Sequence, residues 1–426
     1  MGTFSHWCTR LRVTPLLYAS FWLFAFGLFE TSVAQPITLN EAFIRAAAAD
    51  PALPAAIDRI NAAEANIRQA DTSPNPTVLF ELENFAGTGQ IGALDQSVTT
   101  LSYAQTVERG DKRQARISLA RAGLQSVELQ RQIHALDLFE SVEVAWVEAA
   151  AAEASIALNE ERLAAVQRLQ AETDRRVAAA REPAFAGARV SALLAETEIA
   201  LASARTNAQT TRTTLAAYWD GTSQIELDPL WLERSKEISE PLLVENNADL
   251  ALFEAERQSA GARLGLEEAR AVQDPTFAGG VRHFAVGNDF ALVASVAIPL
   301  PLNNDNSGNI SRAMAERRAA NQEYAAQRRN LQREFTTLRT RIAAQKTESE
   351  ALANSAIPEA ERALGLIREG FDRGAFEYID IIDAERNLNN AKLRRLEILR
   401  SAHLDLARLN RITGRYAFII SDQEIR

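Results

Sequence analysis

The sequence predicts a mainly helical protein with a small β part, in which two strands and a long helical hairpin occur twice. Three observations lead to this prediction. The segment 50–77 returns about 199 residues later as 249–276, with Asp50 matching Asp249. Four short segments alternate apolar and polar residues, and two alanine-rich stretches contain almost no glycine or proline. A duplication on this scale indicates one structural unit built twice.

The chain begins with a segment of the secretory type. Basic residues precede an apolar run from Val13 to Phe29, and small residues follow at 32–34. This arrangement predicts a signal peptide over 1–34 and a mature chain that starts at Gln35. A retained membrane anchor is the alternative, although the apolar run is at the short limit for a spanning helix.

We expect two repeats after the signal peptide. The first covers 35–220 and the second covers 246–414, with an inter-repeat linker at 221–245 and a C-terminal tail at 415–426. Each repeat opens with a helix that leads into a strand. The tail is short, and the sequence assigns it no role.

Four segments have strand character, two in each repeat. They span about 77–85, 98–107, 276–286 and 290–298. Each has about the 9–11 residues of a tilted transmembrane strand, although alternation suits a soluble half-buried sheet equally well. Four strands cannot close a barrel, and an open edge is not tolerated in lipid. If these strands span a membrane, several protomers must contribute to one barrel.

Each repeat then continues into a long helical hairpin. The hairpins are expected at about 110–219 and 310–412, and the first arm of the second one at 310–368. Strong helix formers dominate both, and the arm from Lys112 to Arg181 would be a rod on the order of 100 Å long. The apolar stripe of the second hairpin includes Leu331, Phe335, Leu338 and Ile342. Its three-four spacing is typical of a coiled coil.

Composition and motifs argue against several classes of function. The formal net charge is −10, which makes nucleic acid an unsuitable partner. The glycine pattern at 87–92 precedes a strand rather than a helix, so we interpret it as a hairpin loop and expect no cofactor. The histidines are isolated and the single Cys8 lies in the expected signal peptide, so no metal site or disulfide is predicted. No catalytic motif is present, so we expect no enzyme.

Several local motifs carry a resemblance to a known family. The segment 37–42 resembles an opening helix, and Pro74-Asn75-Pro76 resembles the start of a first barrel strand in TolC-type outer-membrane efflux proteins. The segments 80–87, 101–108 and 109–113 are similar to the CzcC branch of that family, which serves heavy-metal exporters of the resistance-nodulation-division (RND) type. The resemblance covers about 37–414.

The resemblance implies a fold, partners and a location. Three protomers would share a twelve-stranded barrel in the outer membrane and a helical tunnel in the periplasm. A periplasmic adaptor protein and an inner-membrane RND pump would be the partners. The expected function is a passive conduit for heavy-metal cations. The alternatives are a channel for drugs or a secreted polypeptide and, in another class, a soluble periplasmic coiled-coil scaffold.

The hairpin turns are the first candidate site. Pro183 and Gly374 interrupt the helices, and small and apolar residues follow each of them. The resemblance implies that these residues dock the adaptor or pump. They are Phe185, Ala186, Gly187, Ala375 and Phe376. An exposed phenylalanine at a loop tip favours a contact surface, and the alternative is that these are ordinary loop residues.

The second candidate site follows the second turn. Asp380 and Asp383 resemble the family's periplasmic gate, and their i, i+3 spacing places both on one helix face. Threefold symmetry would make a ring of six carboxylates that favours cations. The alternative is that the two aspartates cap the helix or pair with arginines. In the archetype of the TolC-type family, an arginine four residues before the first aspartate helps to hold the closed state. This chain has Phe376 at that position, so the resemblance does not extend to that arginine.

Overall fold

The computed structural model describes residues 37–89, 91, 94–234, 247–417 and 419. All of them belong to one compact unit, Pro36–Arg426. The signal peptide expected over 1–34 lies outside the described residues, as do parts of the expected linker and of the C-terminal tail.

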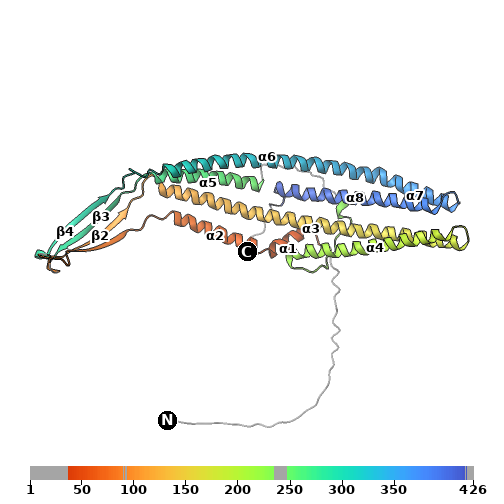
Figure 1. Cartoon of the computed structure of the whole chain (residues 1–426), viewed down its shortest axis with the longest axis horizontal. Helices are drawn as coiled ribbons and strands as arrows, with labels where there is room; N and C mark the ends of the chain where they lie inside the picture. Colours follow the sequence, from red (N-terminus) through yellow and green to blue (C-terminus); the bar gives the residue numbers. More distant parts are fainter. Residues whose placement is uncertain (1–36, 90, 92–93, 235–246, 418, 420–426) are drawn as a thin grey trace, which may run out of the picture. The chain divides into compact units, whose positions relative to one another are not determined.

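Helices make up most of the described chain, and a single small sheet accompanies them (Figure 1). The helices are α1 (Leu39–Ala49), α2 (Ala52–Ala70), α3 (Lys112–Ala178), α4 (Ala184–Ala216), α5 (Ala248–Arg270), α6 (Ser307–Ala351), α7 (Ile357–Asp372) and α8 (Tyr378–Ile412). The strands are β1 (Thr77–Glu83), β2 (Val98–Thr106), β3 (Thr276–Phe284) and β4 (Asp289–Ala297). Short 3₁₀ turns lie at Leu94–Gln96, Ala217–Trp219, Trp231–Glu233 and Val286–Asn288. The predicted mainly helical class is confirmed.

The sheet has the order β1-β2-β3-β4, and every neighbouring pair is antiparallel. The central pair, β2 and β3, joins the two repeats, with Leu101 opposite Val281. The hydroxyl oxygens of Thr106 and Thr276 lie 2.9 Å apart at one end of this pair. The outer edges of β1 and β4 have no partner strand among the residues that the structure describes.

The register divides the sheet into two chemically different faces. One face carries the large apolar or aromatic side chains and also Thr99, Gln105 and His283, and we call it the apolar face. Its large apolar or aromatic residues are Val78, Phe80, Leu82, Leu101, Tyr103, Phe277, Val281, Phe290, Leu292 and Val296. The other, the polar face, carries the charged side chains Glu81, Glu83, Arg282 and Asp289 with hydroxyl and small residues, beside a few apolar ones. Arg282 Nε donates to Thr100 Oγ1 at 2.9 Å on this face. Side chains of the apolar face are largely exposed, and Leu292 reaches 87%.

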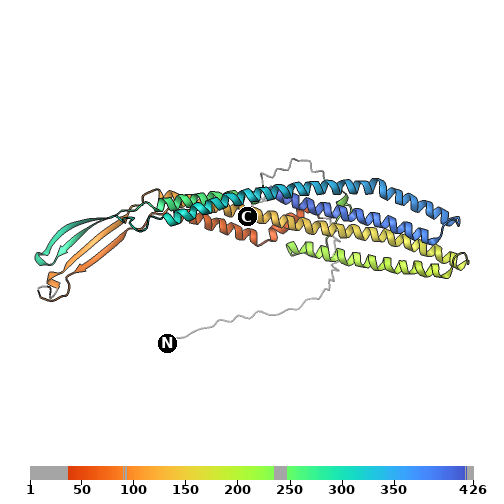
Figure 2. The same cartoon turned by 45° about the horizontal axis from the view of Figure 1, so that its top comes forward.

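The helices form two successive groups along the long helix α3 (Figure 2). Next to the sheet, α3 packs with α2 and α5, and α5 packs with α6. Farther along, α3 packs with α4 and α8, and α8 packs with α6 and α7. The stripe predicted in the second hairpin is buried where it was expected, because Leu331, Phe335 and Leu338 form a cluster with Leu409 and Ile412.

The first arm of the second hairpin departs from the sequence prediction. Instead of one regular helix over 310–368, a π-helical segment at Leu352–Ala356 separates α6 from α7. Pro358 is the second residue after this segment, and a proline has no N–H and clashes with the carbonyl four residues before it. A π segment is a common way for a helix to absorb such an interruption. The long helix α3 of the first hairpin has no proline over its length.

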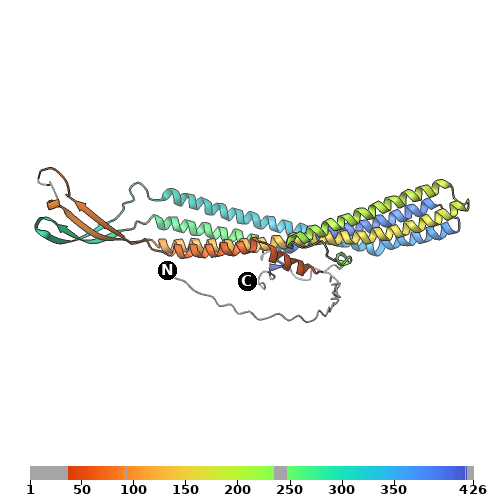
Figure 3. The same cartoon turned by 90° about the horizontal axis from the view of Figure 1, so that it is seen from below.

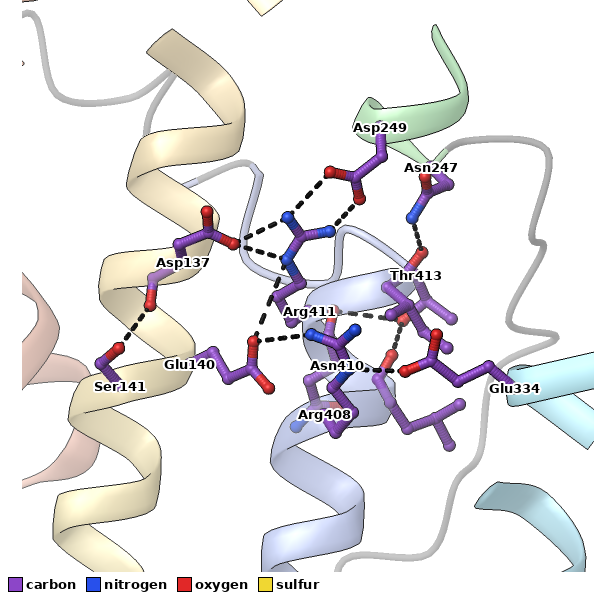
Figure 4. Close-up of polar contacts among 12 residues, drawn as sticks. Asp137, Glu140, Ser141, Asn247, Asp249, Glu334, Arg408, Asn410, Arg411 and Thr413 are labelled. Atoms are coloured by element: carbon purple, nitrogen blue, oxygen red, sulfur yellow. Dashed lines mark hydrogen bonds and ion pairs between the residues drawn. The ribbon is translucent and has the colours of Figure 1, made fainter. Parts of the chain in front are cut away.

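An arginine network holds the end of α8 where α5 begins (Figure 4). Arg411 is 7% exposed and pairs with both carboxylate oxygens of Asp249 on α5. It also donates to Asp137 on α3 at 2.7 Å. Asn247 caps α5 by accepting from the backbone N–H of Leu250, and its amide donates to the carbonyl of Ile412 at 2.7 Å.

The duplicated aspartates perform equivalent roles in the two repeats. Asp50 accepts from the N–H of Ala52 at the start of α2 and pairs with His134 on α3 at 2.9 Å. Asp249, its counterpart, lies in the first turn of α5 and pairs with Arg411 on α8. In both repeats this aspartate therefore ties the start of a short helix to a long one.

A buried carboxyl group lies one turn from this network. Glu143 on α3 is 4% exposed, and its Oε1 accepts from Asn410 Nδ2 at 3.0 Å and from the Tyr416 hydroxyl at 3.2 Å. Its Oε2 has no hydrogen-bond partner in the part of the chain that the structure describes. Burial outweighs the two hydrogen bonds and raises the pKa of Glu143 to about 7.

The raised pKa of Glu143 makes stability depend on pH. The folded protein holds this proton more tightly than the unfolded chain, so the stabilisation is complete below about pH 4.5 and is lost as the pH rises towards 7. Glu143→Gln cannot ionise, so we expect it to be more stable than the wild type at pH 8, by at most about 3 kcal/mol. At pH 5 the gain should shrink. Thermal unfolding of the two detergent-solubilised proteins at both pH values measures this, and an equal gain at both would contradict it.

Candidate functional site

The two hairpin turns lie beside each other at the ends of the helices farthest from the sheet (Figures 2 and 3). The first joins α3 to α4 and the second joins α7 to α8. Each contains a residue in the left-handed region, Ala180 with φ 55° and Gly374 with φ 79°. Glycine adopts this conformation without strain, which accounts for Gly374 at the second turn.

One buried apolar cluster joins the two turns. The first hairpin contributes Leu169, Ala186 and Val190, and the second contributes residues that include Phe371 and Tyr378. Because these side chains come from both hairpins, separating the tips would expose apolar surface to water. The cluster therefore holds the second hairpin against the first in the conformation described.

Polar contacts connect the same two hairpins. The Arg176 guanidinium on α3 lies 3.7 Å from the centre of the Phe371 ring, and it also pairs with Asp372 at 3.4 Å. The partly exposed Lys392 on α8 bridges to Glu161 on α3 at 2.9 Å and to α7. The cation–π contact between Arg176 and Phe371 is of a kind that contributes about 0.5–2 kcal/mol. Sequence reasoning missed both basic residues, since each reads as an ordinary charge on a helix surface.

The five residues expected to dock a partner differ in how much surface they present. Phe185 is 60% exposed and Phe376 is 46% exposed, and Ala375 is exposed as well. Gly187 is half-buried, and Ala186 lies inside the buried cluster with no exposed surface. A docking protein could therefore touch the two phenylalanines and Ala375 directly, whereas Ala186 could only shape the surface beneath it.

Both phenylalanines are oriented by their neighbours. The ring of Phe185 meets that of Tyr378 edge-on at a centroid distance of 6.4 Å, which links the first tip to the start of α8. Phe376 packs against Gly370, where an added Cβ would lie 2.2 Å from the ring. Gly370 thus makes room for the aromatic side chain that occupies the place of the archetype's arginine.

Asp380 and Asp383 have different local partners. The backbone N–H of Glu377 donates to Asp380 Oδ2 at 2.9 Å, and the Glu377 side chain accepts from the backbone N–H of Asp380, which is a capping box at the start of α8. Asp383 is exposed and forms an ion pair with Arg386 at 3.5 Å. Exposed pairs of this kind contribute little to stability.

Both aspartates line one open hollow on the second hairpin. Its other lining residues come from α7 and α8 and are Ala360, Ala363, Ile367, Ala384 and Asn387. The wall is therefore made of three alanines, one isoleucine and the polar Asn387, with the two carboxylates as its acidic part. Within the described residues, no three acidic, histidine or cysteine side chains are grouped so as to hold a metal ion.

A family comparison places this fold among known proteins. The family described as outer membrane efflux protein matches residues 44–221 and 241–415, which is most of the chain and includes both repeats. The chain belongs to the outer membrane efflux protein family. The resemblance drawn from the sequence is thereby confirmed, and as an outer membrane efflux protein the chain is a channel protein rather than an enzyme.

Individual relatives agree with the family. The cobalt-zinc-cadmium resistance protein CzcC of Cupriavidus metallidurans is 29% identical over 403 residues, covering 91% of this chain and 92% of CzcC. The outer membrane protein VceC of Vibrio cholerae superposes with a TM-score of 0.73 at 20% identity, covering 88% of this chain and 96% of VceC. The open state of the MtrE outer membrane channel of Neisseria gonorrhoeae gives 0.70 at 17% identity, covering 88% of each. Both structures share the fold of this chain.

Among the described residues, no helix combines the length and the apolar character needed to cross a membrane.

The different partners of the two aspartates lead to a testable difference. Asp380→Ala removes the capping box, which should destabilise the start of α8 by about 1 kcal/mol and speed amide exchange over 378–382 by about fivefold. Asp383→Ala removes no cap and should leave exchange there nearly unchanged. Hydrogen–deuterium exchange with mass spectrometry compares the two. Equal effects of both substitutions would show that Asp380 has no special structural role.

Proposed function

We propose that this protein is the outer-membrane component of a tripartite efflux system, and that three copies form a passive conduit for heavy-metal cations. The observation that carries the proposal is the sheet, whose apolar face is exposed and whose two edges have no partner strand within the described ranges of the chain. The expected signal peptide, 1–34, would direct the chain out of the cytoplasm. The two repeats would then build the barrel and the tunnel together.

The two faces suit a barrel wall. Transmembrane barrels place apolar side chains towards lipid and polar ones towards the lumen. Here the apolar face would meet lipid, and the face that carries Glu81, Glu83 and Arg282 would line the channel. A soluble scaffold would have to leave the apolar face in water, and so large an exposed apolar patch is rare in soluble monomers.

The unpaired edges call for further copies of the chain. Backbone groups of β1 and β4 that enter hydrocarbon must be hydrogen-bonded, because water is absent there. Pairing β4 of one protomer with β1 of the next satisfies both edges when the ring closes. Three copies of four strands give a barrel of twelve, within the range of known outer-membrane barrels.

The helices would extend this channel into the periplasm. The 67 residues of α3 give a rod on the order of 100 Å long. At its far end, the hairpin tips would form the entrance, where an adaptor protein or the RND pump docks on Phe185, Ala375 and Phe376. The buried Ala186 and half-buried Gly187 would set the shape of this surface.

The entrance would be gated by the second hairpin. Three copies of Asp380 and Asp383 would place six carboxylates around the constriction, which attracts cations. The contacts of Arg176 and Lys392 with the second hairpin would hold the closed form. Opening would then require these contacts to break while Asp380 keeps its cap on α8.

The proposed substrate class is based on the name of a related protein. CzcC is named for resistance to cobalt, zinc and cadmium, and it matches the chain over nearly its whole length. An acidic entrance suits hydrated cations by charge alone, without a binding site for the metal. Drugs and secreted polypeptides are the alternative cargoes, and they would need no acidic ring.

The gate is tested by conductance in planar bilayers. We expect Asp383→Asn to lower cation selectivity and to weaken block by a trivalent cation by about tenfold or more, because three charges leave the ring. Glu359→Gln is a matched control, since this exposed carboxylate on α7 forms its ion pair along its own helix, with Arg362. An unchanged block in Asp383→Asn, or an equal loss in the control, would overturn the gate assignment.

The cargo is tested in cells. A strain that lacks this gene should become sensitive to cobalt, zinc or cadmium, and the wild-type gene should restore growth. Sensitivity to antibiotics with unchanged metal tolerance would instead favour the drug channel. Fractionation of the same cells serves as the control, because the protein must first be found in the outer membrane.

A further inference from the structure

We propose that the segment Ile298–Leu302, which follows β4, is a lipid-binding collar that lies among the phospholipid headgroups of the inner leaflet. This inference rests on the proposed barrel and adds to it a stretch of non-strand chain that contacts the membrane. The segment connects β4 to α6, where sheet gives way to helices (Figure 3). We refer to it as the collar segment.

The collar segment continues the apolar face of β4. Along the strand, Phe290, Leu292 and Val296 stand on the apolar face at even spacings. The alternation does not stop at Ala297, because Ile298, Leu300 and Leu302 follow at every second position. They are 59%, 71% and 82% exposed, so none of them packs into the chain itself.

Two of the five residues of the collar segment have no backbone hydrogen-bond donor, and a third residue uses its donor within the segment. Pro299 and Pro301 have no N–H, and the N–H of Leu302 donates to the carbonyl of Leu300 at 2.9 Å. An unpaired backbone donor is costly in a medium without water. A stretch with few free donors can therefore lie against lipid without belonging to a sheet.

The first repeat provides an internal comparison. At the equivalent exit from β2, the N–H of Val107 donates to the carbonyl of Pro275 at 3.0 Å, and that of Arg109 donates to Asp274 at 2.8 Å. Arg109 occupies the position that corresponds to Leu300, three residues after its strand. The exit from β2 is thus charged and hydrogen-bonded to the residues just before β3, whereas the exit from β4 is apolar and has no such contact to another element among the residues described.

The number of apolar-face positions along β4 indicates how deep in the membrane the collar segment would lie. An apolar band of about 25 Å, crossed at about 40°, takes about ten residues of strand. The nine positions from Phe290 to Ile298 nearly fill this band, so Leu300 and Leu302 lie just beyond it. The next four residues, 303–306, are three asparagines and an aspartate, which marks where the chain enters water.

A lipid fits the collar segment better than a second copy of the chain does. A neighbouring protomer would approach β4 through its edge, in the plane of the sheet, and it would need backbone donors to extend the ladder. Pro299 and Pro301 remove those donors. Leu300 and Leu302 lie beyond the end of β4 and are exposed, so closing the barrel along the strand edges would leave them uncovered.

Single-cysteine labelling tests the collar segment, because Cys8 is the only cysteine and lies in the expected signal peptide. The fluorophore NBD is attached to Leu300→Cys or Leu302→Cys, and the protein is reconstituted in phosphatidylethanolamine–phosphatidylglycerol vesicles. The vesicles contain phosphatidylcholine with a nitroxide at acyl carbon 5 or 12. Leu292→Cys is the control for a label inside the membrane, and Ile199→Cys on α4 is the control for a label in water. Arg109→Cys carries the label at the corresponding position after β2, in the first repeat.

We expect both collar labels to be quenched by the shallow nitroxide at least twofold more than by the deep one. Leu292→Cys should be quenched by the deep nitroxide, and the labels at 109 and 199 by neither. If Leu292→Cys is quenched while the labels at 300 and 302 are as unquenched as the label at 109, the collar proposal is wrong and the proposed barrel is unaffected. A blue-shifted, unquenched collar label would mean that protein covers it, which also overturns the collar. If Leu292→Cys itself is unquenched, the proposed barrel fails and the collar fails with it.

Discussion

The rest of the structure depends on one constraint, which is that a strand edge needs a partner. In the part of the chain that the structure describes, the edges of β1 and β4 have no partner strand, and one large apolar face lies between them. The described helices pair with neither edge, because they leave the sheet at its end and do not cover either face (Figure 1). The assembly, the membrane and the channel in our proposal are three consequences of this deficiency.

The duplication explains how one chain supplies four strands and two helical hairpins from a single repeated unit. Each repeat supplies one strand pair and one helical hairpin, and the β2–β3 pair joins the two repeats inside the sheet. The same aspartate is used twice, as Asp50 with His134 and as Asp249 with Arg411, to tie a short helix to a long one. The repeats then diverge where their roles differ, at the apolar exit from β4 and at the π segment before α7.

Local pattern was enough to predict the elements of this fold. The four strands follow from alternation, and each begins within a residue of its expected start. The long helices follow from composition, and the coiled-coil stripe was found because its spacing is local. The π segment was missed, although Pro358 was visible, because a proline in a long helix can be absorbed by a kink, a break or an insertion.

The candidate site was predictable only in part, for a physical reason. Asp380 and Asp383 were identified by a motif, but i, i+3 spacing at a helix start serves a capping box and a charged ring equally well. Arg176 has a local partner in Glu172, but the partners of Arg176 and Arg411 on other helices lie 162 to 274 residues away in the sequence, so no local pattern reveals those contacts. Ala186 was selected as a contact residue by its position in the turn, and its complete burial depends on the second hairpin.

The most direct test of this account is the mass of the assembled particle. Native mass spectrometry of protein extracted from the outer membrane in detergent counts the copies without any assumption about function. We predict a particle with three times the mass of the processed chain. A single chain, or a pair, that keeps its strands in detergent would contradict the closed twelve-stranded barrel and everything derived from it.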